Sequence, residues 1–162
     1  MDFSGEGPWE LPITGFRVQR LTFAMAVTVL AYAEEESVLI SLPGPFSLEQ
    51  PGVGLLRLDP ERQSWQELDP LFSLRDDRIT RATATRDAAL RVEFSSGRVL
   101  SARSEGQFEN WEVSARGYTI IGTPGQVTVW DQAALSEAAT VDATELGDLL
   151  ERLRQERRTD PV

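Results

Sequence analysis

Two glutamates in the segment GQFENWEV, residues 106–113, are the side chains best placed to do chemistry. Glu109 and Glu112 lie three positions apart, next to a tryptophan. A pair of carboxylates on either side of a scissile bond is the catalytic set of most glycosidases, where one residue donates a proton and the other acts as base or nucleophile. This pair is therefore the catalytic candidate that has to be weighed first.

The same segment also has a purely structural interpretation. If it enters a strand, Trp111 points inward, whereas Asn110 and Glu112 point outward, because side chains alternate along a strand. We therefore predict a corner anchored by Phe108 and Trp111, in which Glu109 satisfies local backbone groups. A role of the two glutamates in an interface, or in catalysis, stays open as an alternative.

The composition removes most other catalytic machinery. The chain contains no histidine, no cysteine and no lysine. Triads built on histidine or cysteine, zinc sites with those ligands and lysine Schiff bases are therefore excluded. The triplet Glu34-Glu35-Glu36 lacks the spaced ligands and the central glycine of a calcium loop, so we interpret it as a solvated hairpin turn. No catalytic residue, metal or cofactor is expected.

The strongest binding signal is negative charge. The net charge is −10, from 16 arginines against 26 acidic residues, which disfavours nucleic acid and favours a basic partner. The alternative is that acidity only keeps the protein soluble. Six carboxylates gather in residues 58–77, and with the two glutamates above they form the predicted partner-binding set: Asp59, Glu61, Glu67, Asp69, Asp76, Asp77, Glu109 and Glu112.

Hydrophobic patterning predicts a mainly β (α+β) fold with antiparallel sheets. In residues 90–94, Leu90, Val92 and Phe94 alternate with Arg91 and Glu93, which is the pattern of a half-buried strand. Later segments at 111–115, 118–122 and 126–130 are separated by glycine-containing turns and read as a meander.

An internal duplication is predicted from two similar units, residues 12–58 and 74–130. FRVQRLT (16–22) resembles DRITRAT (77–83) at an offset of 61, and TVLAY (28–32) aligns with LRVEF (90–94) at an offset of 62. Each unit then reads as three short strands followed by a Gly-x-Phe corner. The predicted domains are a duplicated β domain over 1–130 and a helical appendage over 131–162.

Short helices are expected in two places. In the link between the units, Asp-Pro pairs at 59–60 and 69–70 suit an N-cap and a first helical position. Five apolar residues of this link are expected to pack on the core: Trp65, Leu68, Leu71, Phe72 and Leu74.

The best helix in the sequence is expected at 141–158. Its leucines at 146, 149, 150 and 153 form one apolar stripe, and arginines follow at 152, 154, 157 and 158. This C-terminal α-helix either docks on its own sheet or serves as an interaction helix, for example in a homodimer.

Neither a signal peptide nor a membrane span is expected. The first ten residues are polar and acidic, and the longest apolar run, residues 21–33, is too short to cross a bilayer and reads as a buried strand. We therefore expect a cytoplasmic protein.

Five motifs, taken in order, resemble a family of small actinobacterial proteins of unassigned function. They are LPITGFRVQRL, LLRLDPE, ALRVEFSSGRVLSA, FENWEV and GTPGQVTVW, and they cover about residues 9–130. Phe108, Glu109 and Trp111 fill an aromatic-Glu-x-Trp signature, and Trp130 ends the last motif, while Gln126 stands near where a second glycine is expected. The resemblance makes Phe108, Trp111 and Trp130 signature residues, and it implies no reaction.

The size, acidity and absence of a catalytic set are similar to those of immunity proteins from bacterial polymorphic toxin systems. We therefore expect a non-enzymatic, cytoplasmic binding protein that neutralises a basic toxin domain through an acidic face. Two alternatives remain: a carboxylate-based hydrolase, and a homo-oligomeric structural protein assembled through the leucine stripe.

Overall fold

The structure, a computed structural model, describes residues 8–64, 66–103 and 109–131, which form two six-stranded antiparallel sheets. Sheet A contains, in spatial order, β1 (Trp9–Glu10), β7 (Ile79–Ala84), β8 (Ala89–Phe94), β9 (Val99–Arg103), β5 (Phe46–Gln50) and β6 (Gly54–Leu58). Sheet B contains β12 (Gln126–Asp131), β11 (Tyr118–Thr123), β10 (Trp111–Ala115), β4 (Glu36–Leu42), β3 (Val27–Ala33) and β2 (Arg17–Phe23). The mainly β, antiparallel fold class predicted from the sequence is confirmed.

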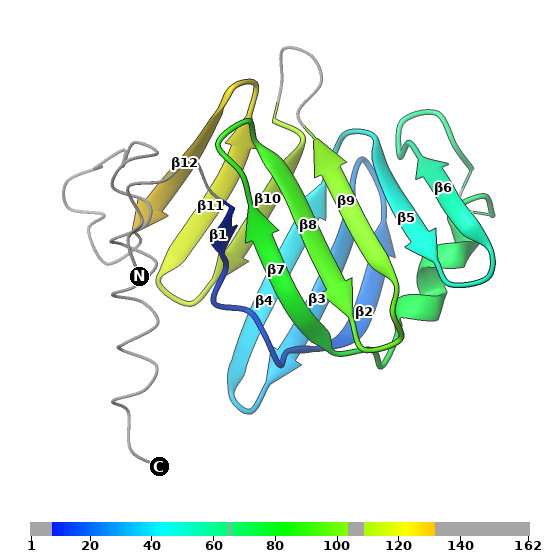
Figure 1. Cartoon of the computed structure of the whole chain (residues 1–162), viewed down its shortest axis with the longest axis horizontal. Helices are drawn as coiled ribbons and strands as arrows, with labels where there is room; N and C mark the ends of the chain where they lie inside the picture. Colours follow the sequence, from blue (N-terminus) through cyan, green and yellow to red (C-terminus); the bar gives the residue numbers. More distant parts are fainter. Residues whose placement is uncertain (1–7, 65, 104–108, 132–162) are drawn as a thin grey trace.

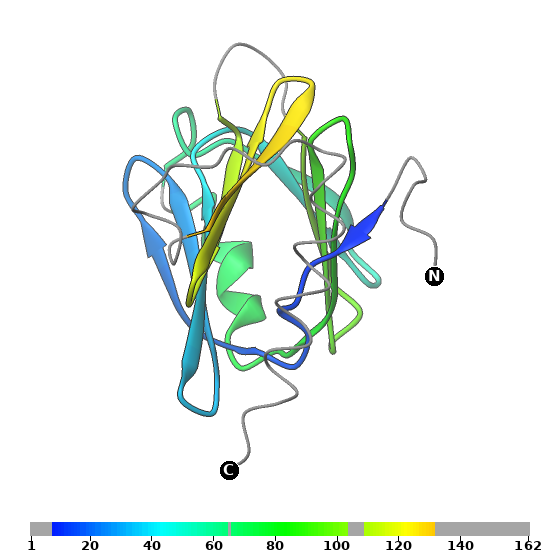
Figure 2. The same ribbon diagram turned by 90° about the vertical axis from the view of Figure 1, so that its left-hand side faces the viewer.

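The two sheets face each other as the layers of a sandwich (Figure 1 and Figure 2). Every second residue of the central strands points between the layers and is buried, for example Leu90 and Val92 from sheet A and Val29 and Ile40 from sheet B. The predicted alternation in 90–94 is thus confirmed. Burial of these side chains is the main favourable term that holds the layers together.

The two predicted units interlock in this sandwich. The first unit contributes the meander β2–β3–β4 to sheet B and the hairpin β5–β6 to sheet A, whereas the second contributes β7–β8–β9 to sheet A and β10–β11–β12 to sheet B. The units meet in the pairs β4–β10 and β5–β9. Each sheet therefore contains strands of both units.

The predicted duplication stays a prediction, but strand irregularities fall at corresponding places. The pairing of β2 with β3 shifts register between Val18 and Arg20, and that of β7 with β8 shifts between Ile79 and Arg81, 61 residues later. The offset of 62 for the following strand is wrong. Residues 23 and 27 pair across the β2–β3 turn, and residues 84 and 90 pair across the β7–β8 turn. The β7–β8 turn is therefore longer by two residues, and β3 corresponds to β8 at an offset of 63.

The apolar run at 21–33 is two strands and not the single buried strand that was predicted. The chain turns at Ala24–Ala26 between β2 and β3, and the side chain of Met25 at the turn is 91% exposed. The described residues contain no helix with the length and apolar character needed to cross a membrane.

Of the two short helices expected in the link, the described residues contain one. It is the 3-10 helix η1 (Asp69–Leu74), which lies between the two sheets (Figure 2) near the β5–β6 end of the sandwich (Figure 1). Its N-cap is Leu68, without a side-chain cap, so Asp69 is not the predicted cap. The first Asp-Pro pair forms a turn, in which the N–H of Gln63 donates to the carbonyl of Asp59.

Several predictions lie outside the described residues. These are the anchoring role of Phe108, the core packing of Trp65 and the C-terminal helix at 141–158. The predicted boundary at residue 130 falls inside β12, which runs on to Asp131.

Candidate functional site

The eight predicted partner-binding carboxylates do not form one surface. Six belong to the link between β6 and β7, which we call the acidic connector (residues 59–77), at the η1 end of the sandwich (Figure 1). Glu109 and Glu112 belong instead to the start of β10, between β4 and β11 in sheet B. The predicted set is therefore divided between two regions, which have to be judged separately.

The two glutamates near β10 do not have the setting of a catalytic pair. Glu109 is exposed at the corner that precedes the strand, and Glu112 lies on the outer face of sheet B, where its Oε1 accepts a 2.5 Å hydrogen bond from the hydroxyl of Ser114. A glycosidase needs both carboxylates to face one substrate in a cleft. Strand alternation instead places Glu112 on the outer side of the sheet.

Trp111 anchors the corner, as predicted, whereas the outward direction predicted for Asn110 is wrong. The indole of Trp111 is fully buried and donates a 2.8 Å hydrogen bond to the carbonyl of Ala88. Asn110 was expected to point outward, but it is only 5% exposed, and its Nδ2 donates to the carbonyl of Arg103 at 2.5 Å. The corner residue precedes the strand, so the alternation of the strand does not govern its side chain.

Two carboxylates of the acidic connector hold local structure. Asp59 accepts a 3.1 Å hydrogen bond from the N–H of Glu61, which fixes the turn after β6. Glu67 accepts hydrogen bonds from both the N–H (2.8 Å) and the hydroxyl (2.9 Å) of Ser64. These bonds, first that from the backbone and then that from the hydroxyl, lower the pKa of Glu67 below its ordinary value.

Asp77 is also structural, because it ties the start of β7 to the turn between β8 and β9. Its carboxylate accepts hydrogen bonds from the hydroxyls of Ser95 and Ser96, and Nη1 of Arg98 lies 3.6 Å away. The side chain is only 12% exposed. Asp76 is exposed and adopts a left-handed backbone conformation, with Nε of Arg17 at 4.0 Å. A partner has little access to Asp77 and ready access to Asp76.

Glu61 and Asp69 are the connector carboxylates best suited to bind a partner. Both are exposed, and within the described residues no hydrogen bond or ion pair engages either carboxylate. The connector as a whole holds six acids and two arginines, a net charge of −4. Of the six predicted residues, the structure therefore leaves mainly Glu61, Asp69 and Asp76 to create an outward-facing negative field.

The sequence did not reveal which large apolar side chains are exposed. Among the described residues, the largest exposed fractions of big apolar side chains are found at Met25 (91%), Val53 (68%), Leu55 (60%) and Phe72 (45%). Phe72 was expected in the core. A 3-10 helix has three residues per turn, so Leu71 and Leu74 share the buried side of η1 and Phe72 is directed away from it.

Contacts of η1 connect these apolar residues to both sheets. The ring of Phe72 meets that of Phe23 in β2 edge to face, with ring centroids 5.2 Å apart. On the other side, Nε2 of Gln50 in β5 donates to the carbonyl of Pro70 and to the hydroxyl of Ser73, at 3.3 Å each. Phe23 and Gln50 lead into the turns that carry Met25 and Val53, respectively. η1 is therefore held between the hairpin β2–β3 of sheet B and the hairpin β5–β6 of sheet A.

We call this region the acidic end, and define it by the half-exposed ring of Phe72 on η1 together with the exposed carboxylates of Glu61, Asp69 and Asp76. Exposed apolar side chains beside charge are typical of protein-binding surfaces. The described residues contain no group of three acidic side chains arranged to hold a metal ion. This arrangement is suited to binding a protein.

Comparison with known proteins assigns a family and no activity. Residues 9–131 match the model of a family of unknown function, DUF6188, and the chain belongs to this family. The resemblance noted in the sequence over residues 9–130 is thereby confirmed at the level of an uncharacterised domain. No curated protein and no solved structure matches the chain.

Proposed function

We propose that this member of the DUF6188 family is a non-enzymatic binding protein whose acidic end receives a basic protein partner. The observation that carries the proposal is the combination, at one end of the sandwich, of the half-exposed ring of Phe72 with the exposed carboxylates of Glu61 and Asp69, which no other described residue engages. An aromatic anchor contributes most of its binding energy when a partner completes its burial.

The charge of the acidic end would act chiefly on the rate of association. Exposed carboxylates attract a basic surface over a distance of about 8 Å at physiological ionic strength, so they speed the encounter and lose this effect as salt is added. Burial of Phe72 would act on dissociation instead. The two kinds of residue therefore make separate contributions that kinetic measurements can distinguish.

The partner class that fits this chemistry is a bacterial toxin domain with an Arg- and Lys-rich active site. An acidic surface that covers such a site excludes a negatively charged substrate and neutralises the toxin. We propose this immunity function in the cytoplasm of the producing cell. The support is the net charge of −10, the acidic end and the similarity in style to immunity proteins.

The proposal is tested by capture of the tagged protein from its source cells at low and at moderate salt, followed by mass spectrometry. A stoichiometric basic protein that is lost as salt rises is the expected result. The recovered partner is then purified, its toxicity is measured in cells with and without this protein, and its binding kinetics are recorded. Recovery of the protein alone from cells that express a candidate toxin would contradict the proposal.

Matched variants connect the partner to the acidic end. The double variant Glu61→Gln/Asp69→Asn should slow association and flatten its salt dependence. Phe72→Ala should raise Kd roughly 30-fold, mainly through faster dissociation, since hot-spot aromatics contribute about 2 kcal/mol. The control Glu34→Gln/Glu109→Gln removes the same charge from exposed positions elsewhere and should leave binding unchanged. Equal effects of the two double variants would show that only net charge matters.

A further inference from the structure

The outer faces of the two sheets differ sharply in charge. On sheet A, outward positions of the central strands carry arginine and glutamate, for example Arg91 paired with Glu93 at 3.1 Å. On sheet B, one complete cross-strand row of outward residues contains a single charge; it runs Arg20, Leu30, Leu39, Ser114, Thr119 and Trp130. The outer face of sheet B therefore has a row with few charges and is the better suited of the two to be covered.

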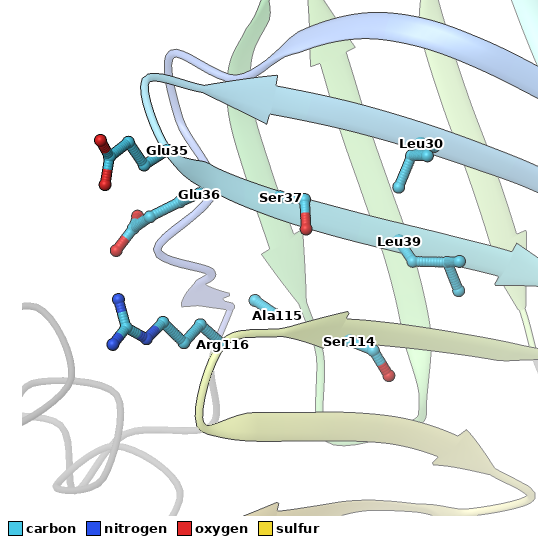
Figure 3. A pocket seen from close by; sticks show the side chains of 8 residues that line it. All are labelled: Leu30, Glu35, Glu36, Ser37, Leu39, Ser114, Ala115 and Arg116. Atoms are coloured by element: carbon cyan, nitrogen blue, oxygen red, sulfur yellow. The ribbon is translucent and has the colours of Figure 1, made fainter.

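A groove of about 430 Å³ lies on this face (Figure 3). Leu30 and Leu39, neighbours on β3 and β4, form its apolar floor. Glu35 and Glu36, from the turn between the same strands, lie together with Arg116 at one end of the groove. The groove thus combines an apolar floor with a mainly acidic rim, which suits a segment that presents leucines and arginines together.

The remainder of this chain contains such a segment. In residues 141–158, leucines at 146, 149, 150 and 153 recur at helical spacing, and arginines stand at 152, 154, 157 and 158. The chain enters this segment from β12, the edge strand of sheet B, whose Trp130 already belongs to the outward row. The last described strand before this segment therefore lies in sheet B, whose outer face carries the row with a single charge.

We propose that residues 141–158 dock as an amphipathic helix on the outer face of sheet B of the same molecule. The leucines would cover Leu30 and Leu39, and the following arginines would lie near Glu35 and Glu36. The site is separate from the acidic end, so this proposal and the binding function can fail independently.

The dimensions permit this docking. Strands are about 4.8 Å apart, so β3, the fourth strand from β12, lies roughly 20 Å from it. The nine residues 132–140 reach at most about 30 Å when extended. A helix of 18 residues is about 27 Å long, close to the roughly 24 Å between the outermost strands of a six-stranded sheet. A single molecule can thus cover its own face.

The absence of cysteine from the chain allows a direct test on the full-length protein. A nitroxide spin label is attached at Ser37→Cys, an exposed outward position of β4 at the groove, and amide signals are recorded by nuclear magnetic resonance. The matched control is the label at Ser101→Cys, an outward position of β9 in sheet A. Amides of residues 146–153 should lose most of their intensity with the Ser37→Cys label and little with the control.

A mixed sample distinguishes docking within a molecule from docking between two copies. It contains one protein that carries the spin label but no ¹⁵N, and one that carries ¹⁵N but no spin label, so only contact between copies can weaken the signals. Intramolecular docking predicts no loss in the mixture; a clear loss there would overturn the proposal in favour of a dimer, in which ¹⁵N-labelled molecules meet spin-labelled partners. The docking proposal would also be overturned if the amides of residues 146–153 lost intensity with neither label, or only with the Ser101→Cys label.

The variant Leu149→Asp supplies a second measurement. In the Ser37→Cys protein it should restore the amide signals of residues 150–153 while the sheet signals stay in place. Retained broadening in this variant would contradict docking through the leucine stripe.

Discussion

Substitution of Gly122 by alanine should destabilise the protein through one buried ring. A Cβ at this position would lie 2.1 Å from Cε2 and 2.2 Å from Nε1 of Trp111, its cross-strand partner. Carbon atoms are in optimal contact at about 3.5–4.0 Å, so the ring would have to move by roughly 1.5 Å. The ring is fully buried, and its Nε1 is bonded to the carbonyl of Ala88.

The expected cost of this substitution follows from two terms. Overpacking of a core costs about 1–3 kcal/mol, and loss of the hydrogen bond to Ala88 leaves a buried carbonyl unsatisfied at about 1–3 kcal/mol. Gly122→Ala should therefore lower the free energy of unfolding by about 2–6 kcal/mol, a large part of the about 5–15 kcal/mol of a typical domain. The neighbouring Thr123→Ala, which removes one 3.3 Å hydrogen bond at the surface, is the control.

Urea unfolding followed by far-ultraviolet circular dichroism measures the free energy of unfolding of both variants. The comparison holds when this free energy falls with urea concentration at the same slope in each variant. The decisive comparison is a double-mutant cycle. In a Trp111→Phe background, Gly122→Ala should cost at least about 1 kcal/mol less, because the ring that blocks the new methyl group is smaller. An equal cost in both backgrounds, or a cost for Gly122→Ala similar to that of Thr123→Ala, would refute the reasoning.

Three further predictions test other parts of the structure. Asn110→Ala should cost about 1–3 kcal/mol in urea unfolding, since it removes a buried side chain that donates to the backbone; a change below about 0.5 kcal/mol would contradict this role. Asp77→Ala should cost a similar amount, about 1–3 kcal/mol, because it leaves Arg98 without its carboxylate partner, and a melting temperature equal to that of the parent would argue against it. Since the pKa of Glu67 is lowered in the folded state, the contribution of this carboxylate to stability is complete above its unfolded pKa and is lost as pH falls through the folded pKa. A carboxyl titration by nuclear magnetic resonance should show a depressed midpoint for Glu67, and this midpoint should rise in Ser64→Ala. A midpoint that is the same in Ser64→Ala would disprove the contribution of the hydroxyl.

The link between the units shows how far sequence patterns reach. The same Asp-Pro dipeptide occurs twice, and the first aspartate does organise a local turn, as its short-range hydrogen bond to Glu61 shows. The second begins a 3-10 helix without a side-chain cap. Its helix type decides that Leu71 is buried and Phe72 half exposed. A list of apolar residues cannot reveal this difference, because it depends on how the segment fits between the sheets.

The eight candidate carboxylates show the same limit. The sequence locates them but cannot say which have internal partners. Asp77 has partners in the turn between β8 and β9, about twenty residues away in the chain, whereas Asp69 remains exposed and unpaired among the described residues. Local spacing carries no information on contacts of this kind.

The sequence by itself determined the mainly antiparallel β architecture, since alternating burial is a local property of strands. It also excluded the chemistries of histidine, cysteine and lysine, which no fold can restore. Only the tertiary structure decided that each sheet contains strands of both units, through the pairs β4–β10 and β5–β9. Such pairs form between segments far apart in the chain, and what selects them is the joint packing of two layers around one core.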